Sequence, residues 1–235
     1  MGHKTKALKH AFPYTIPVLA GFSLLGLAYG LLMQVNGYNF IWSTLTSLFV
    51  FAGAGQYFLL TMLVSTFNPL YTFVIILFIN FRYAFYGVTM LDKYKDTGKM
   101  KPFLIHALCD ETFATNSTVE LPPDIDRNWF YFFITLLNYS YWAIGTLVGG
   151  LIGEIITIEI IGLNFALTAL FVVIFVDQWF KTKNHNPALL GVVAGLISLY
   201  FIGPSYFMIP ALIVSVAILF GFKSKFINEV NGNAK

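Results

Sequence analysis

Charged residues are scarce in this sequence. They make up 11% of its 235 residues, whereas hydrophobic residues make up 57%. A soluble domain carries about 25% charged residues, so the composition excludes an ordinary soluble globular protein. Apolar runs of about twenty residues, the length that crosses a bilayer as a helix, recur along the chain. The sequence therefore predicts an all-α polytopic membrane protein with a single transmembrane domain over residues 1–235.

Several kinds of site are missing as well. The single cysteine, Cys109, excludes an internal disulfide framework, and His106, Cys109 and Asp110 do not follow a recognised zinc spacing. The basic residues behind the net charge of +3 flank apolar segments instead of forming one stripe, so no nucleic-acid partner is predicted. No phosphate-binding loop and no protease motif is present. We expect no metal, no cofactor and no enzymatic activity.

Hydropathy predicts about seven transmembrane helices in contact with membrane lipid. They lie near residues 13–34, 40–66, 70–91, 129–153, 157–180, 187–203 and 206–222. Residues 103–120 favour a helix but are too polar to face lipid. We interpret this stretch as an interfacial or half-inserted helix that packs its polar side against protein.

The lysines give conflicting indications of orientation. Those of the loop after residue 91 mark a cytoplasmic loop, and those near the C-terminus agree: Lys93, Lys95, Lys99, Lys101, Lys181, Lys183, Lys223 and Lys225. Three simple crossings before that loop would put Lys4, Lys6 and Lys9 outside, against the positive-inside rule. Either the N-terminus is outside, or residues 40–66 enter and return as a re-entrant pair broken at Gly53–Gly55.

A weak internal repeat bears on this choice. "TSLFVFAGAGQYF" (46–58) aligns without gaps on "TALFVVIFVDQWF" (168–180), and "GLAYGL" (26–31) loosely resembles "GTLVGG" (145–150). Two three-span halves, about 13–91 and 129–203, predict the inverted repeat of many secondary transporters. That arrangement favours an N-terminus outside, and the re-entrant alternative stays open.

The repeat contains the first candidate site. Gly53 and Gly55 allow a helix to unwind or a ligand to approach the backbone, and Gln56 would orient that ligand. The repeat places Gln178, preceded by Asp177, opposite Gln56. The alternative is close helix packing through small residues, with Gln56 bonded to a neighbouring helix.

Arg82 is the second candidate, with Asn80 two residues before it. An arginine at this depth of span 70–91 is costly against lipid, so we expect it to bind the substrate or to form an ion pair. The alternative is that its side chain snorkels to the interface.

Polar residues also gather in residues 106–118. Asp110 and Glu111 point about 100° apart on a helix, so one is expected to pair with Arg82. His106 and Asp110, four residues apart, would share a helix face as a proton-sensitive pair. With Asp177, these residues are the candidates for proton coupling. The alternative is a solvated helix with ordinary surface charges.

Three stretches carry a family resemblance: "FAGAGQYF" (51–58), "INFRYAFYG" (79–87) and "CDETFA" (109–114). In this order the chain resembles the AzlC-type branched-chain amino acid export permeases, and the resemblance extends to residues 163–178. It implies a multi-pass carrier of the bacterial inner membrane that exports leucine, isoleucine, valine and related amino acids. It also implies a small hydrophobic AzlD-type partner subunit. The alternative functions are a non-transporting membrane scaffold subunit and, less favoured by the missing motifs, a membrane-embedded enzyme.

Overall fold

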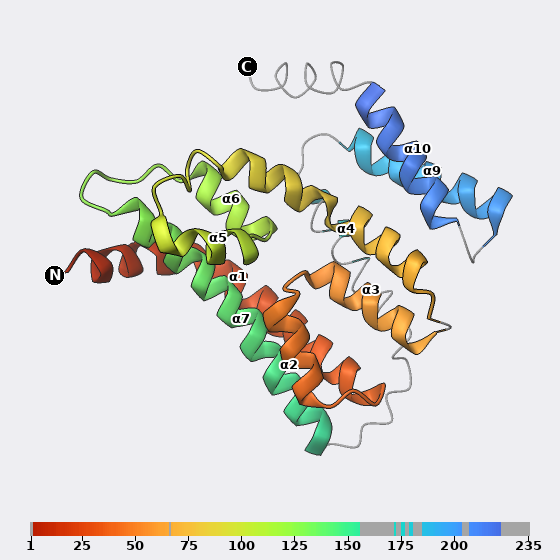
Figure 1. The fold of residues 1–235 in the computed structure, drawn as a ribbon, viewed down its shortest axis with the longest axis horizontal. Coiled ribbons are helices and arrows are strands. Elements are labelled where there is room, and N and C mark those ends of the chain that lie inside the picture. Colours follow the sequence, from red (N-terminus) through yellow and green to blue (C-terminus); the bar gives the residue numbers. More distant parts are fainter. Residues whose placement is uncertain are drawn as a thin grey trace. The chain divides into compact units, whose positions relative to one another are not determined.

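The described part of the chain is helical and contains no strand. The computed structural model describes residues 2–65, 67–155, 172, 175–176, 179–180, 185–203 and 207–221, which fall into two compact units, one within residues 1–163 and one within 164–235. Three described helices are long and apolar enough to cross a membrane: α1 (His3–Val35), α4 (Pro69–Met90) and α7 (Arg127–Ile155) (Figure 1). The predicted helical class is confirmed. The expected span 157–180, with Asp177 and Gln178, lies largely outside the described residues.

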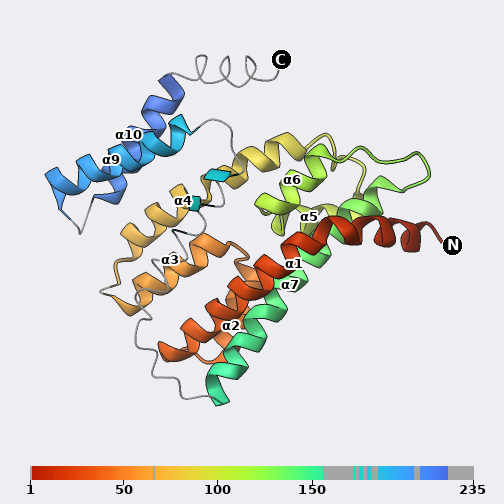
Figure 2. The ribbon, with the colours of Figure 1, turned by 180° about the vertical axis from the view of Figure 1, so that it is seen from behind.

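Helices α1 and α7 pack along each other through glycines, side by side in both ribbon views (Figures 1 and 2). A Cβ added to Gly26 or Gly30 would meet main-chain atoms of α7, and one added to Gly145 or Gly149 would meet main-chain atoms of α1. Glycines four residues apart let two helix backbones touch in this way. Residues 26–31 and 145–150, which sequence analysis compared as repeat equivalents, are therefore the two faces of one helix crossing.

These two helices run in the same direction. His10 packs on Phe130 near the start of both helices, with ring centroids 5.8 Å apart, and Gln34 lies against Gly153 near their ends. An inverted repeat with halves at 13–91 and 129–203 requires α1 and α7 to run in opposite directions. That arrangement is wrong for these two helices, and the reason lies in the segment that follows α1.

Residues 40–66 form a broken pair of helices, α2 (Phe40–Phe49) and α3 (Gly53–Val64), instead of one continuous span. Phe40 packs on Gly150 near the end of α7, and Phe51 reaches Tyr139 near the middle of α7, with ring centroids 4.8 Å apart. Helix α2 therefore runs against α7 for about half its length. The chain breaks there at residues 50–52, just before the expected Gly53–Gly55.

Helix α3 returns toward the end from which α2 came. Gly55 in its first turn packs on Asn80 of α4, and α4 runs on from Asn80 to Met90, which lies among core residues that include Ala11 and Phe130. The start of α4, and with it the end of α3, therefore lies on the other side of the break, toward Val35 and Ile155. The α2–α3 hairpin enters and leaves at one end of the helix pair, as in the re-entrant alternative.

A second hairpin follows α4. It consists of a 3₁₀ turn (Gly98–Met100), α5 (Lys101–His106) and α6 (Asp110–Thr118), broken at residues 107–109. Along α6, Phe113 stacks on Tyr86 at 4.3 Å and the Asn116 amide donates to the Tyr94 hydroxyl at 2.9 Å, so α6 returns to the lysine-rich loop in the same direction as α4. The expected single helix over 103–120 is wrong, because Cys109 adopts an extended backbone conformation.

The α5–α6 hairpin closes a core at the start of α1 and α7. The fully packed side chains there are Ala11, Met90, Tyr94, Leu104, Leu108, Phe130, Tyr131 and Ile134. Burial raises the pKa of Tyr94 to about 12, so its phenol stays neutral at physiological pH. A neutral phenol accepts the Asn116 hydrogen bond and keeps its own proton.

The lysines of the N-terminus and those of the loop after α4 lie at this same end, which we call the lysine end. Lys6 bridges Asp124 at 3.4 Å, and Lys4 lies over the Trp129 ring at 4.3 Å, while Lys93 binds the carbonyl oxygens of Asn116 and Ser117. The expected separation of the N-terminus from the lysine loop is therefore wrong. Because α2 and α3 together do not cross, only α4 separates α1 from this loop, and the lysine conflict disappears.

Thiol labelling from either side of the membrane tests this arrangement. Cysteines replacing Lys9 and Lys95, both exposed at the lysine end, are expected to react from the same side. A cysteine replacing Ile155, which is 82% exposed at the far end of α7, is expected to react from the other. Labelling of Lys9→Cys and Lys95→Cys from opposite sides would contradict the hairpin.

The second unit contains two described helices that pack on each other, α9 (Asn186–Ile202) and α10 (Met208–Gly221). Helix α9 begins with Pro187 in its first turn, where the missing N–H costs no hydrogen bond. Both helices are apolar, as the spans expected near 187–203 and 206–222 require.

Candidate functional site

The break in the α2–α3 hairpin has an unusual backbone. Phe51 has a φ of +41°, in the left-handed region that side chains with a Cβ rarely adopt. The Thr46 carbonyl accepts hydrogen bonds from both Val50 N–H (2.9 Å) and Phe51 N–H (3.4 Å), which ends α2. Strained residues of this kind persist where surrounding contacts hold them, and they gather at binding sites and switch regions.

The glycines lie in the first turn of α3, where they make room for large neighbours. A Cβ on Gly53 would come within 3.3 Å of the Trp142 ring, and one on Gly55 within 2.9 Å of the Asn80 amide nitrogen. These glycines therefore do not form the break. They bring α3 against α7 on one side and against α4 on the other.

Gln56 holds the break together. Its side chain is fully buried, and its Oε1 accepts from the Ala52 N–H at 3.2 Å and from the Trp142 indole N–H at 3.1 Å. Its Nε2 donates to Ser47 Oγ at 3.2 Å. The contacts of Gln56 are those of the packing alternative, since its amide links both helices of the hairpin to α7.

Replacing Gln56 with leucine is expected to lower the melting temperature and to slow transport. The change leaves the Ala52 N–H and the Trp142 indole without acceptors, and each unpaired buried donor costs about 1–3 kcal/mol. Thermal unfolding in detergent measures the loss. Ser65→Ala is the control, because Ser65 is exposed and its hydroxyl donates to the Met62 carbonyl at the end of its own helix. Equal melting temperatures for the two variants would contradict this role.

Arg82 and Asp110 form an ion pair between α4 and α6. Arg82 Nη1 lies 2.7 Å from Asp110 Oδ2, and the two side chains are 30% and 34% exposed. Glu111, the next residue of α6, is partly buried. His106 belongs to α5, so the expected His106–Asp110 pair on one helix face is wrong: the break at residues 107–109 separates them.

Several polar atoms near this pair have no partner in the part of the chain that the structure describes. They are buried side-chain atoms of the two candidate segments: Asn80 Oδ1, Arg82 Nε and Asp110 Oδ1. Buried polar groups are normally hydrogen-bonded, so unpaired ones indicate a place for a ligand or water. Asn80 faces α3 and Arg82 faces α6, so these atoms line the middle of α4 from two sides.

Sequence analysis missed residues of α7 that join the two hairpins. Asn138 Nδ2 donates to Thr112 Oγ1 at 3.1 Å, Tyr139 contacts Phe51, and Trp142 binds Gln56. A buried asparagine and an indole within one apolar span were the available signals, because polar groups at such a depth need partners.

Two cavities lie elsewhere. One of about 490 Å³ opens at the lysine end beside Asp92, Asp96, Glu120 and Arg127. Another, of about 220 Å³ and apolar, lies between α4 and α5. Neither includes Arg82 or Asp110 in its lining, so the candidate site is defined by its unpaired polar atoms and by the broken helices.

Comparison with known proteins places the chain in a family. The sequence profile described as "AzlC protein" matches residues 17–156, which contain every described candidate residue. The chain belongs to the AzlC family. Among the AzlC relatives is the "Branched-chain amino acid transport protein AzlC" of Bacillus subtilis, 43% identical over 91% of this chain and 84% of that protein.

Other relatives of the AzlC family are described only as membrane proteins. An "Uncharacterized membrane protein" of Haemophilus influenzae is 40% identical over 89% of this chain and 86% of its own length. A further one, of Helicobacter pylori, is 38% identical over 94% of this chain and 96% of its own. No solved structure matches the chain.

Proposed function

We propose that the chain is a secondary transporter that carries leucine, isoleucine, valine or a similar apolar amino acid across the bacterial inner membrane. The observation that supports a site of this kind is the broken α2–α3 hairpin. Its turn lies at the middle of the α1–α7 pair, beside unpaired polar atoms. The substrate class rests on the Bacillus subtilis relative, whose description names branched-chain amino acid transport.

An amino acid is a zwitterion, and the site offers partners for both of its charges. The first N–H groups of α3 lack intrahelical partners and carry the positive end of the helix dipole, so with Arg82 they suit the carboxylate. Asp110 Oδ1 and Asn80 Oδ1 are acceptors for the ammonium group. Gly53 and Gly55 let this turn of α3 be approached closely, and Gln56 fixes its position.

The remaining features of the proposal concern direction, energy and assembly. The lysine end faces the cytoplasm by the positive-inside rule, and the chain exports its substrate. Asp110 and Glu111 of α6 supply the proton coupling, and Asp177 and Gln178 are further candidates that lie outside the described residues. A small hydrophobic AzlD-type subunit completes the transporter, and the chain is not an enzyme.

Flux of labelled leucine into proteoliposomes tests the function. Protein reconstituted with and without an AzlD-type small subunit is expected to exchange leucine across the membrane, with unlabelled leucine, isoleucine or valine competing. Lysine and glutamate, which carry an additional side-chain charge, serve as controls and are expected not to compete. Absence of flux in both preparations would favour the alternative, a non-transporting scaffold subunit.

A further inference from the structure

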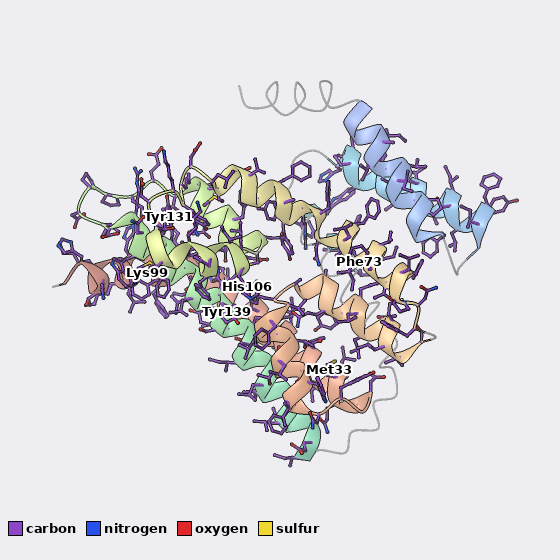
Figure 3. All side chains as sticks on the ribbon, in the orientation of Figure 1. Met33, Phe73, Lys99, His106, Tyr131 and Tyr139 are labelled. Carbon is purple, nitrogen blue, oxygen red and sulfur yellow. The ribbon has the colours of Figure 1, made fainter. Side chains whose placement is uncertain are left out.

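One backbone carbonyl at the break accepts two side-chain hydrogen bonds. The Leu48 oxygen accepts from the Tyr139 hydroxyl at 2.7 Å and from His106 Nε2 at 3.0 Å. A carbonyl oxygen has two lone pairs, so these donors saturate it. Because the carbonyl can only accept, His106 Nε2 must carry the hydrogen. Figure 3 shows His106 and Tyr139 beside each other.

The carbonyl that they bind lies where α2 ends. Carbonyl groups in the last turn of a helix have no intrahelical donor, and Leu48 is one residue from the end of α2 at Phe49. Two residues beyond, Phe51 adopts its left-handed conformation with its ring on Tyr139. Tyr139 and His106 therefore fix the broken end of α2 at the point where the chain turns into α3.

This contact joins two hairpins that come from opposite ends. The α2–α3 hairpin starts near Val35 and Ile155, whereas the α5–α6 hairpin starts at the lysine end, and both breaks lie beside Tyr139. His106 is the last residue of α5, and its bond to Leu48 links one break directly to the other. The bond therefore holds the end of α5 against the end of α2.

We propose that His106 and Tyr139 are positioning residues of the transport site, which hold the end of α2 in the conformation that binds substrate. The inference rests on the proposed transport function for its kinetic consequence. Without these donors the competent conformation is less populated, and apparent affinity falls in proportion to its population. Neither residue needs to touch the substrate.

Matched variants separate this role from simple packing. Tyr139→Phe removes only the hydroxyl, and His106→Leu removes the donor, whereas His106→Gln keeps an N–H donor at a similar reach. Tyr141→Phe is the control, since Tyr141 lies on α7 like Tyr139 but its hydroxyl pairs with Thr15 Oγ1 of α1, away from the break. Tyr139→Phe and His106→Leu are expected to raise the half-saturating leucine concentration about fivefold, the change that one lost hydrogen bond commonly brings. Their maximal rate per molecule is expected to stay near that of the wild type. In His106→Gln and Tyr141→Phe the half-saturating leucine concentration is also expected to stay near the wild-type value.

A second measurement does not depend on transport. Val50, 42% exposed in the break, is replaced with cysteine in each variant, and the rate of alkylation by N-ethylmaleimide is measured. The buried Cys109 of the parent protein serves as the blank. Alkylation is expected to rise about fivefold with Tyr139→Phe or His106→Leu and not with the two controls.

The two readouts distinguish the possible failures. If alkylation changes as expected while the wild type carries no leucine, the positioning role stands and the proposed function fails. If Tyr139→Phe and His106→Leu label like Tyr141→Phe, or if His106→Gln labels like His106→Leu, the positioning role is overturned, whatever the flux.

Discussion

Replacing Arg82 with alanine is expected to abolish transport and to reduce the amount of folded protein. The change removes a candidate partner of the substrate carboxylate and leaves the Asp110 carboxylate without its cation, 2.7 Å away in the intact protein. Removing one member of a buried ion pair costs about 3–5 kcal/mol, and the one-third exposure of both side chains lowers that figure here. Flux per molecule and the melting temperature measure the two effects separately.

Companion variants sharpen the result. Arg82→Lys keeps the charge but loses the planar fork, so it is expected to restore stability more than transport. The double variant Arg82→Ala/Asp110→Ala is expected to regain stability and to remain inactive. Lys6→Ala is the control, since the Lys6–Asp124 pair is 3.4 Å long, largely exposed and worth at most about 1 kcal/mol. Wild-type flux in Arg82→Ala, or active double variants, would contradict a role in binding.

Replacing Gly149 with alanine is expected to prevent the normal packing of α1 on α7. The added Cβ would meet the main-chain oxygen and Cα of Leu27, and a helix backbone cannot move aside as a side chain can. Overpacking in a close contact costs about 1–3 kcal/mol, and a backbone clash lies at the upper end. The measurement is the melting temperature in detergent, together with the yield of monodisperse protein.

Gly21→Ala provides a control of opposite sign. Gly21 lies on α1 with open space around it, so a methyl group meets nothing within 4 Å. Alanine is favoured over glycine within a helix by about 0.5–1 kcal/mol, so this variant is expected to melt slightly higher than the wild type. Equal melting temperatures for Gly149→Ala and Gly21→Ala would show that the glycine crossing contributes nothing to stability.

The helical class and the soft break near residue 51 were predictable from the sequence. Hydropathy detects long apolar runs, and glycines with a glutamine in such a run stand out. The direction of each helix was not predictable in this way, because hydropathy is the same for a helix that crosses and for one that turns back halfway. The conflict between the N-terminal lysines and three simple crossings correctly indicated a hairpin. The weak repeat favoured a symmetric arrangement instead, which the directions of α1 and α7 contradict.

The partners of the polar residues depend on packing between distant segments. Arg82 was expected to meet Asp110 or Glu111, and the structure brings it to Asp110. The pairing of His106 with Asp110 assumed a continuous helix, which the extended Cys109 interrupts. Gly26, Gly30, Gly145 and Gly149 carry a spacing that identifies helix crossings, yet spacing alone does not name the partner helix.

The bond between Trp142 and Gln56 has a consequence for biosynthesis. The two residues are 86 positions apart, so Gln56 leaves the ribosome long before its indole donor exists. At about 5–20 residues per second, the interval is roughly 4–17 s. During this time Gln56 has only its partners within the hairpin, the Ala52 N–H and the Ser47 hydroxyl, and lacks the bond that ties the hairpin to α7. The hairpin therefore reaches its final packing only after α7 is made.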